Sequence, residues 1–127
     1  MPSPARPAID PPPAGTVACD DWVTFVRTLQ PASIDLLYAD PPFNTGKTQH
    51  GRSRNGTGQK TGAPPPSYDD TFASVEAWVG WLRERLDATL PAIKATGSIL
   101  LHVDWRTSHH ARLLLDELLG ADRFVNH

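Results

Sequence analysis

Two short, nearly continuous apolar segments, each followed by an aspartate, constrain the fold of this chain more than any other feature. Residues 34–39 read Ile-Asp-Leu-Leu-Tyr-Ala before Asp40, and residues 98–103 read Ser-Ile-Leu-Leu-His-Val before Asp104. Apolar runs of this length are typical of strands that are buried on both faces, as in parallel sheets covered by helices. The two segments therefore predict a parallel α/β sheet, with an acidic side chain closing each strand.

A helix is predicted over about residues 74–90, between the two strands. Its apolar residues recur every third or fourth position and so share one face: Val75, Trp78, Val79, Leu82, Leu86 and Leu90. Ser74 stands where an N-cap is expected, and Pro91 ends or kinks the helix. We assign Trp78 and Trp81 to packing of this helix, with no part in base stacking.

Further elements flank this central unit. Residues 16–19 are β-prone and precede apolar residues at helical spacing over 22–29, a pattern that predicts strand, turn and helix. Gly97 supplies a turn before the second apolar strand, and a last helix over about 111–118 closes near Gly120. The order strand–helix, three times repeated, predicts three parallel strands with covering helices. A sheet of three such strands is expected to be incomplete.

Composition limits both the core and the class of protein. The chain has 127 residues, of which 39% are hydrophobic, and six of its 13 prolines fall within the first 13 residues. Residues 1–14 have no apolar period and are expected to form a disordered tail, so the domain is assigned to residues 15–127. The single cysteine, Cys19, excludes an internal disulfide and a multi-cysteine zinc site.

Charge and hydropathy exclude two modes of association. The net charge of −2 is unlike that of a histone-like polycation and argues against electrostatic adhesion to membranes, so any contact with nucleic acid must be local. There is no apolar run of about 18 residues and no signal peptide, so a cytoplasmic protein is expected.

A long basic loop is predicted over residues 44–70. Between residues 44 and 68 it holds five of the nine glycines, three consecutive prolines and no acidic residue. Its four basic side chains would each neutralise a DNA phosphate, which gives affinity without sequence readout. We take Asn44 together with these four as candidate DNA contacts: Lys47, Arg52, Arg54 and Lys60. The alternative is a solvated surface loop.

The tetrapeptide Asp40-Pro41-Pro42-Phe43 at the end of the first apolar strand has the chemistry to bind an exocyclic amine. An aromatic amino group is a poor nucleophile because its lone pair is delocalised into the ring. A carboxylate that accepts one N–H and a proline carbonyl that accepts the other localise this lone pair for attack on an electrophilic methyl group. The prolines fix the backbone, and Phe43 offers a face on which a flipped base can stack.

A simple turn is the alternative for this tetrapeptide. The chain contains its own comparison, because Asp10-Pro11-Pro12 repeats the tripeptide in the proline-rich tail, without a preceding apolar strand or a following aromatic residue. We interpret that copy as linker. The second copy differs in having a strand before it, an aromatic residue after it and a basic segment next in sequence.

Three stretches of the chain resemble a known family. Residues 33–46, Ser-Ile-Asp-Leu-Leu-Tyr-Ala-Asp-Pro-Pro-Phe-Asn-Thr-Gly, look like the catalytic motif and lead-in strand of the amino-directed DNA methyltransferases, which methylate adenine N6 or cytosine N4 with S-adenosylmethionine. Residues 68–70 and 97–109 are similar to the segments that come after that motif in members of the family. The resemblance covers about residues 17–126.

The resemblance implies a partial Rossmann-like methyltransferase fold, S-adenosylmethionine as cofactor, double-stranded DNA as substrate and a place in restriction-modification. In this family the Asp and prolines hold the target amine and the aromatic residue stacks on the flipped base, so Asp40, Pro41, Pro42 and Phe43 are the expected catalytic residues. Related enzymes have an acid near the cofactor in the place of Asp20, which makes it the candidate cofactor contact. Asp at the head of the motif favours adenine over cytosine.

One family motif does not occur in this chain: the Phe-x-Gly-x-Gly segment that grips the methyl donor. Members of the family differ by circular permutation, and a catalytic motif near the N-terminus implies the class in which the Gly-rich segment lies far downstream. The chain therefore resembles the N-terminal part of the catalytic domain. By itself it is expected to be inactive, with a second polypeptide as one source of the missing part.

Three other interpretations compete. Gly46-Lys47-Thr48 resembles the end of a phosphate-binding P-loop, but that pattern requires glycine where this chain has Pro41. Several histidines fall close together in the sequence, yet packing explains them better than a metal site, and no metal is expected. The remaining alternative is a noncatalytic DNA-binding remnant whose function lies in the basic segment, or one half of a split methyltransferase.

Overall fold

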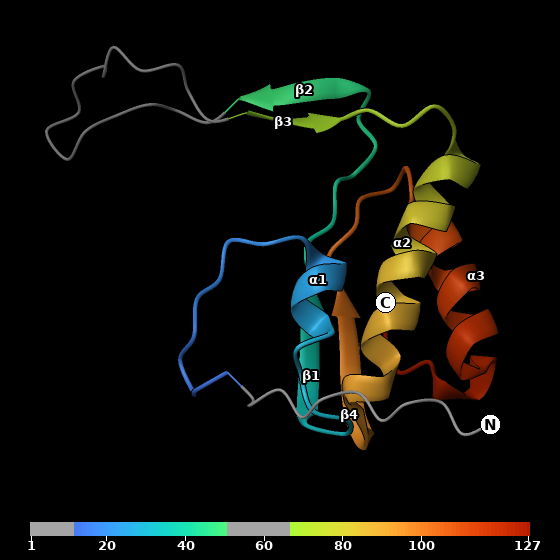
Figure 1. Ribbon diagram of the computed structural model, residues 1–127. Coiled ribbons are helices and arrows are strands. Elements are labelled where there is room, and N and C mark those ends of the chain that lie inside the picture. The colour runs from blue at the N-terminus through green and yellow to red at the C-terminus, as the bar shows by residue number, and fades with distance from the viewer. Residues whose placement is uncertain (1–11, 51–66) are drawn as a thin grey trace, which may run out of the picture. The chain divides into compact units, whose positions relative to one another are not determined.

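The computed structural model describes residues 12–50 and 67–127 (Figure 1). The elements follow in the order α1 (Trp22–Val26), β1 (Ile34–Ala39), β2 (Lys47–His50), β3 (Ser67–Asp70), α2 (Val75–Thr89), a 3-10 turn (Leu90–Ala92), β4 (Ile93–Leu101), α3 (Ser108–Leu119) and a 3-10 turn (Ala121–Arg123). They divide between two compact units. The first unit contains β1, β4, α1 and α2 from Trp81 onward, and the second begins at Asp40 and contains β2, β3 and α3.

Strands β1 and β4 are parallel, which confirms the predicted α/β class. Leu36 is level with Ser98 and Tyr38 with Leu100, and after the last strand residue the amide of His102 still donates to the Ala39 carbonyl at 2.8 Å. The sequence pattern predicts His102 inside the strand. In the structure this residue follows the strand, which ends at Leu101. Strand β4 ends at Leu101 because β1 offers no further carbonyl beyond Ala39 in this ladder.

Gly97 lies inside β4, so the predicted turn at this glycine is wrong. The strand begins at Ile93, and the register shifts between Ile34 and Leu36, where β4 has an irregularity. A Cβ atom on Gly97 would come within 2.6 Å of Ile93 Cγ2 and 3.0 Å of the Ile34 carbonyl oxygen. Glycine is required here because two backbones approach closely, not because the chain reverses.

The prediction that the two apolar strands are buried on both faces is wrong, because Ala39 is the one residue of β1 and β4 that is buried. Leu36, Tyr38 and Leu100 keep 54%, 62% and 51% of their surface exposed, whereas Ala39 is buried. Partners at the same register of a parallel pair point to the same face. One face of the pair is therefore more covered than the other, which presents apolar side chains.

The predicted strand over residues 16–19 does not form. Val17 is 97% exposed, and none of the described strands pairs with this segment. A β-prone run needs a neighbouring strand to take its backbone hydrogen bonds, so composition alone did not suffice. The following helix is confirmed but ends at Val26, and Asp21 caps it by accepting hydrogen bonds from the amides of Val23 and Thr24.

Helix α2 follows the prediction closely. Ser74 Oγ accepts a hydrogen bond from the Ala77 amide, and Pro91 lies in the 3-10 turn that ends the helix. Trp78, Leu82 and Leu86, which share one face, are completely buried, which confirms their assignment to the core. The pKa of the Glu76 carboxyl lies below its usual value because that group accepts hydrogen bonds from the backbone at its own position and from the Ser74 side chain.

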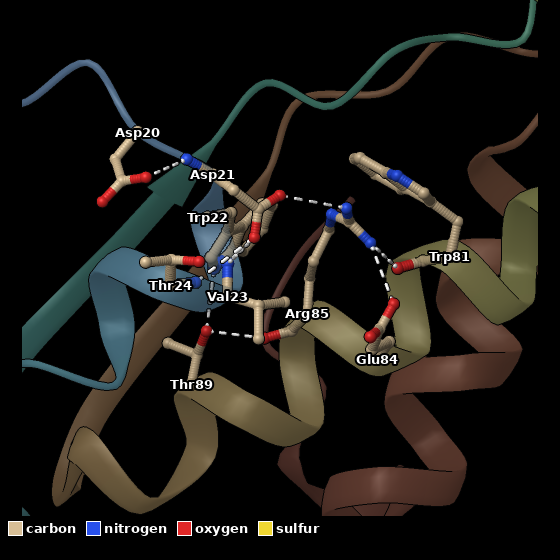
Figure 2. A network of polar contacts seen from close by, with 9 residues as sticks. All are labelled: Asp20, Asp21, Trp22, Val23, Thr24, Trp81, Glu84, Arg85 and Thr89. Atoms are coloured by element: carbon tan, nitrogen blue, oxygen red, sulfur yellow. Dashed lines mark hydrogen bonds and ion pairs between the residues drawn. The ribbon is translucent and has the colours of Figure 1, made fainter.

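Side-chain hydrogen bonds join α1 to α2 in the first unit (Figure 2). Trp22 Nε1 donates to Thr89 Oγ1 at 2.9 Å, and the same hydroxyl donates to the Arg85 carbonyl at 2.7 Å. The Arg85 guanidinium lies 3.9 Å from the centre of the Trp81 ring and pairs with Asp21. The N-cap of α1 is therefore tied to the middle of α2.

We expect Thr89→Val to destabilise the first unit by about 1–3 kcal/mol, because valine keeps the shape of the buried threonine but leaves the Trp22 N–H without its acceptor. Urea unfolding followed by circular dichroism measures the change. Thr24→Val, at an exposed position of α1, is the matched control. Equal midpoints for the two variants would contradict the assigned role of the hydroxyl.

The basic segment contains regular structure, which corrects the prediction of a loop throughout residues 44–70. Strands β2 and β3 pair in antiparallel fashion, from Lys47 opposite Asp70 to His50 opposite Ser67. Polar residues form these strands because the pairing satisfies their backbones and the Asp70 side chain anchors one end. None of the helices in residues 12–50 and 67–127 has the length and apolar character needed to cross a membrane.

Helix α3 confirms the last predicted helix and extends it to residues 108–119, with Gly120 at a φ of 95° after its end. Asp104, which the sequence pattern places directly after the second strand, lies beyond the end of β4 at Leu101. Its carbonyl accepts from the amides of Thr107 and Ser108, and its carboxylate accepts from the Arg106 amide, so it closes the turn before the helix. Thr107 is the N-cap.

Candidate functional site

The Asp-Pro-Pro-Phe segment begins directly after β1 ends at Ala39. Asp40 is exposed, Pro41 is buried, and Pro42 and Phe43 are half-buried. The order gives an exposed acidic residue, a rigid backbone behind it and an aromatic residue with part of its surface accessible. Such an arrangement can accept two hydrogen bonds from a planar amine and stack on its ring.

Trp78 of α2 fixes the second proline of this segment. Its indole Nε1 donates to the Pro42 carbonyl at 2.7 Å, and the whole side chain is buried. A buried indole N–H requires an acceptor, and the carbonyl is held in one direction by satisfying it. Trp78 therefore packs in the apolar face of the helix and also orients the backbone of the candidate site.

Asp70, at the end of β3, fixes the residues after Phe43. Its Oδ1 accepts from the Asn44 amide at 2.7 Å, and its Oδ2 accepts from the Thr45 amide at 3.1 Å and the Thr45 hydroxyl at 2.5 Å. The residue is 1% exposed, and its carbonyl accepts from the Gly46 amide at 3.0 Å. A buried carboxylate is stable only with such donors, so this hydrogen bonding is a built feature of the loop.

The chain turns at Asn44 and Gly46, which have φ angles of 58° and 71°. Asparagine tolerates the left-handed conformation better than most residues, and here its Oδ1 also accepts from the Phe72 amide at 3.2 Å. Asn44 is therefore engaged within the protein on its backbone and its side chain. Its contact with DNA stays a prediction.

The other residues expected to bind DNA or cofactor lie elsewhere. Lys47 begins β2 with an exposed side chain, whereas Arg52, Arg54 and Lys60 fall outside the described residues. Asp20 is exposed in the first unit, where one of its carboxylate oxygens accepts from the Asp21 amide at 2.8 Å. Residues 40–44 therefore lie in the second unit, whereas Asp20 lies in the first.

Histidines do not form a metal centre in the part of the chain that the structure describes, where no cluster of three or more His, Cys, Asp or Glu side chains is placed to hold an ion. His109 and His110, at the start of α3, lie with their ring centres 4.0 Å apart. His109 is exposed and His110 is half-buried, so their assignment to packing stays a prediction.

Sequence reasoning missed two residues of the site. Asp70 was noticed only as part of a family-like stretch, because a carboxylate at the end of a polar strand gives no sign of burial. Asn44 and Gly46 are a signal that could have pointed to a turn here, since asparagine and glycine tolerate the left-handed conformation. Trp78 was assigned to the core correctly, but its hydrogen bond to a backbone 36 positions away was not predictable.

Comparison with known proteins gives matches over most of the chain. A family model described as DNA methylase, for N6 and N4 methyltransferases, matches residues 34–127. The chain is 28% identical over 116 residues to Type II methyltransferase M.KpnI of Klebsiella pneumoniae, which covers 88% of this chain and 25% of that protein. It is 30% identical over 91 residues to Type II methyltransferase M.EcaI of Enterobacter cloacae, covering 72% and 18%.

A further relative is a probable type III restriction-modification enzyme HindVI Mod subunit of Haemophilus influenzae, 24% identical over 93 residues, with 73% of this chain and 10% of that protein covered. The chain therefore spans a quarter or less of the length of these relatives. The match includes the Asp-Pro-Pro-Phe segment, β3, α2, β4 and α3 within residues 34–127.

Proposed function

Because this chain belongs to the DNA methylase family of N6 and N4 methyltransferases, we propose that it carries the amine-binding part of a site that methylates adenine N6 in double-stranded DNA. Residues 15–127 are then the N-terminal part of a catalytic domain. The observation that carries the proposal is an exposed Asp40 at the end of a parallel strand, followed by a backbone that Trp78 and Asp70 hold in place.

Each residue of the tetrapeptide has a role in this proposal. The Asp40 carboxylate accepts one N–H of the target amine, and Phe43 stacks on the flipped base. The second N–H is accepted by a proline carbonyl, that of Pro41 or that of Pro42, the latter of which also accepts from Trp78. The acceptors gain strength as the nitrogen becomes cationic, so they stabilise the transition state more than the ground state. No prior deprotonation of the amine is needed.

S-adenosylmethionine, the donor we propose, supplies an electrophilic methyl group when bound. The Gly-rich motif that grips this donor does not occur in the sequence, and among the residues that the structure describes we propose Asp20 as a contact for it. We therefore assign most of the donor site to polypeptide outside these 127 residues, in the same protein or in a second one. We also propose that the reaction occurs in the cytoplasm, and a role in restriction-modification is supported by the name of one relative.

The test is transfer of a labelled methyl group to duplex DNA by the chain by itself, and by the chain together with the polypeptide encoded beside it. Transfer that requires the second polypeptide supports a split enzyme. The alternative function is noncatalytic DNA binding through the basic segment. DNA binding that survives substitution of Asp40 and Phe43, without transfer under either condition, would favour that alternative.

The basic segment provides a separate prediction. Replacing Lys47, Arg52, Arg54 and Lys60 together with glutamine should weaken DNA binding for all sequences alike. The slope of log Kd against log salt should fall by about 0.9 for each phosphate that the variant no longer neutralises, because each neutralised phosphate releases a condensed counterion. Fluorescence anisotropy at several salt concentrations measures the slope. An unchanged slope would exclude these side chains from phosphate binding.

A further inference from the structure

The positions of Asp70 and Trp78 give Asp70 a role beyond stabilising a hairpin. Phe43 lies between two peptide groups, one joining it to Pro42 and one joining it to Asn44. Trp78 holds the carbonyl of the first, at 2.7 Å, and Asp70 holds the amide of the second, also at 2.7 Å. A residue whose two flanking peptide groups are both held has little backbone freedom left. These contacts restrict the direction of the Cα–Cβ bond of Phe43.

We infer that Asp70 is a positioning residue for the methyl-transfer site, an inference that rests on the proposed function. Its buried carboxylate fixes Asn44 in the left-handed conformation and so turns the chain immediately after Phe43. The aromatic side chain and the carbonyls before it are then oriented before DNA arrives. Pre-organisation of this kind avoids a loss of conformational entropy at the moment when the base is bound.

The hydrogen bonds that Asp70 accepts orient the backbone of residues 44 and 45 as well as stabilise the buried carboxylate. Two successive backbone amides and one hydroxyl approach the two carboxylate oxygens, and Gln49 Nε2 donates in turn to the Thr45 hydroxyl at 3.0 Å. An asparagine in place of Asp70 has the same size but carries two N–H donors where one oxygen stood. It can accept from one amide and must oppose the other donors.

Amide hydrogen exchange of Asp70→Asn, followed by NMR, tests the contact itself. We expect exchange at Asn44 and Thr45 to become faster by about tenfold or more, because a hydrogen bond to a charged acceptor is removed. Asp69→Asn changes the exposed carboxylate next to it in the same strand and is the matched control. Exchange in Asp70→Asn equal to that in the control would overturn the inference, whether or not methyl transfer is observed.

Methyl transfer by the assembled enzyme separates positioning from fold stability. At a temperature well below the melting point of each variant, kcat of Asp70→Asn should fall by about 100-fold with a smaller change in KM for DNA, since a small misplacement of catalytic groups has an effect of this size. Asp69→Asn should behave as wild type. Faster exchange with unchanged kcat would also overturn the inference, and would leave the proposed function standing.

A milder variant keeps the test decisive if Asp70→Asn does not fold. Thr45→Val removes the hydroxyl, and with it the acceptor of Gln49 Nε2, but leaves both amide contacts to Asp70, so a smaller acceleration of exchange and a smaller fall in kcat are expected. No change in either quantity would count against the inference. Turnover that persists in Asp40→Ala would instead count against the proposed function, so the two failures are distinguishable.

Discussion

Asp40→Ala is expected to lower methyl transfer by about 10²–10³-fold, to near the detection limit, while DNA binding is largely spared. The carboxylate at this position is exposed at the end of β1 and is the acceptor that localises the lone pair of the target nitrogen. Loss of one preorganised hydrogen-bonding group at a reacting atom has an effect of this magnitude in other enzymes. Single-turnover transfer of a labelled methyl group and anisotropy of a labelled duplex measure the two quantities.

The chain contains a matched control for this substitution. Asp10→Ala alters the same Asp-Pro-Pro tripeptide in the proline-rich tail and should leave the rate unchanged. Asp40→Asn keeps one acceptor oxygen and should retain more activity than Asp40→Ala. Turnover in Asp40→Ala close to that of the Asp10 variant would mean that the carboxylate does not activate the amine.

The parts of the fold that sequence predicted correctly are those specified by local pattern. Helix α2 has its cap at Ser74 and its stop at Pro91, and both signals act through the backbone within a few residues. Strand β1 was recognisable from a continuous apolar run. Its exposed face was not, because the side chains of Leu36 and Tyr38 are apolar whether or not another element covers them.

Two predictions were wrong, the turn at Gly97 and the strand over residues 16–19, because both depend on where other parts of the backbone lie. Gly97 was interpreted as a turn residue, since glycine most often serves chain reversal, whereas here it allows β4 to approach the Ile34 carbonyl. Residues 16–19 have strand composition but none of the described strands beside them. Periodicity carries no information about either case, because it reports neither the approach of the Ile34 carbonyl to Gly97 nor whether a strand lies beside residues 16–19.

The residues of the candidate site also divide into those that local sequence identifies and those that depend on other parts of the chain. Asp40 to Phe43 could be identified from residue chemistry and from resemblance, because their roles depend on their own side chains and on proline geometry. Asp70 could not, because its role depends on donors from residues 44 and 45. The residues that hold a site rigid are thus harder to recognise from a single sequence than the residues that perform its chemistry.

Trp78→Ala is expected to destabilise the second unit by about 3–5 kcal/mol, a large share of the stability of a small domain. The side chain is completely buried, so the substitution leaves a cavity, and it also removes the donor to the Pro42 carbonyl. Trp78→Phe separates the two effects. It retains most of the apolar volume and loses the hydrogen bond, for which we expect about 1–3 kcal/mol.

Urea unfolding followed by far-ultraviolet circular dichroism measures both changes without relying on the fluorescence of the substituted residue. Trp105→Ala is the matched control, since that tryptophan is 76% exposed and its ring contacts the Arg106 guanidinium at 4.8 Å. It should change stability by no more than about 1 kcal/mol. If Trp78→Phe unfolds like Trp105→Ala yet loses methyl transfer, the indole N–H serves to orient the Pro42 carbonyl more than to stabilise the fold. If it retains both stability and transfer, the hydrogen bond contributes to neither.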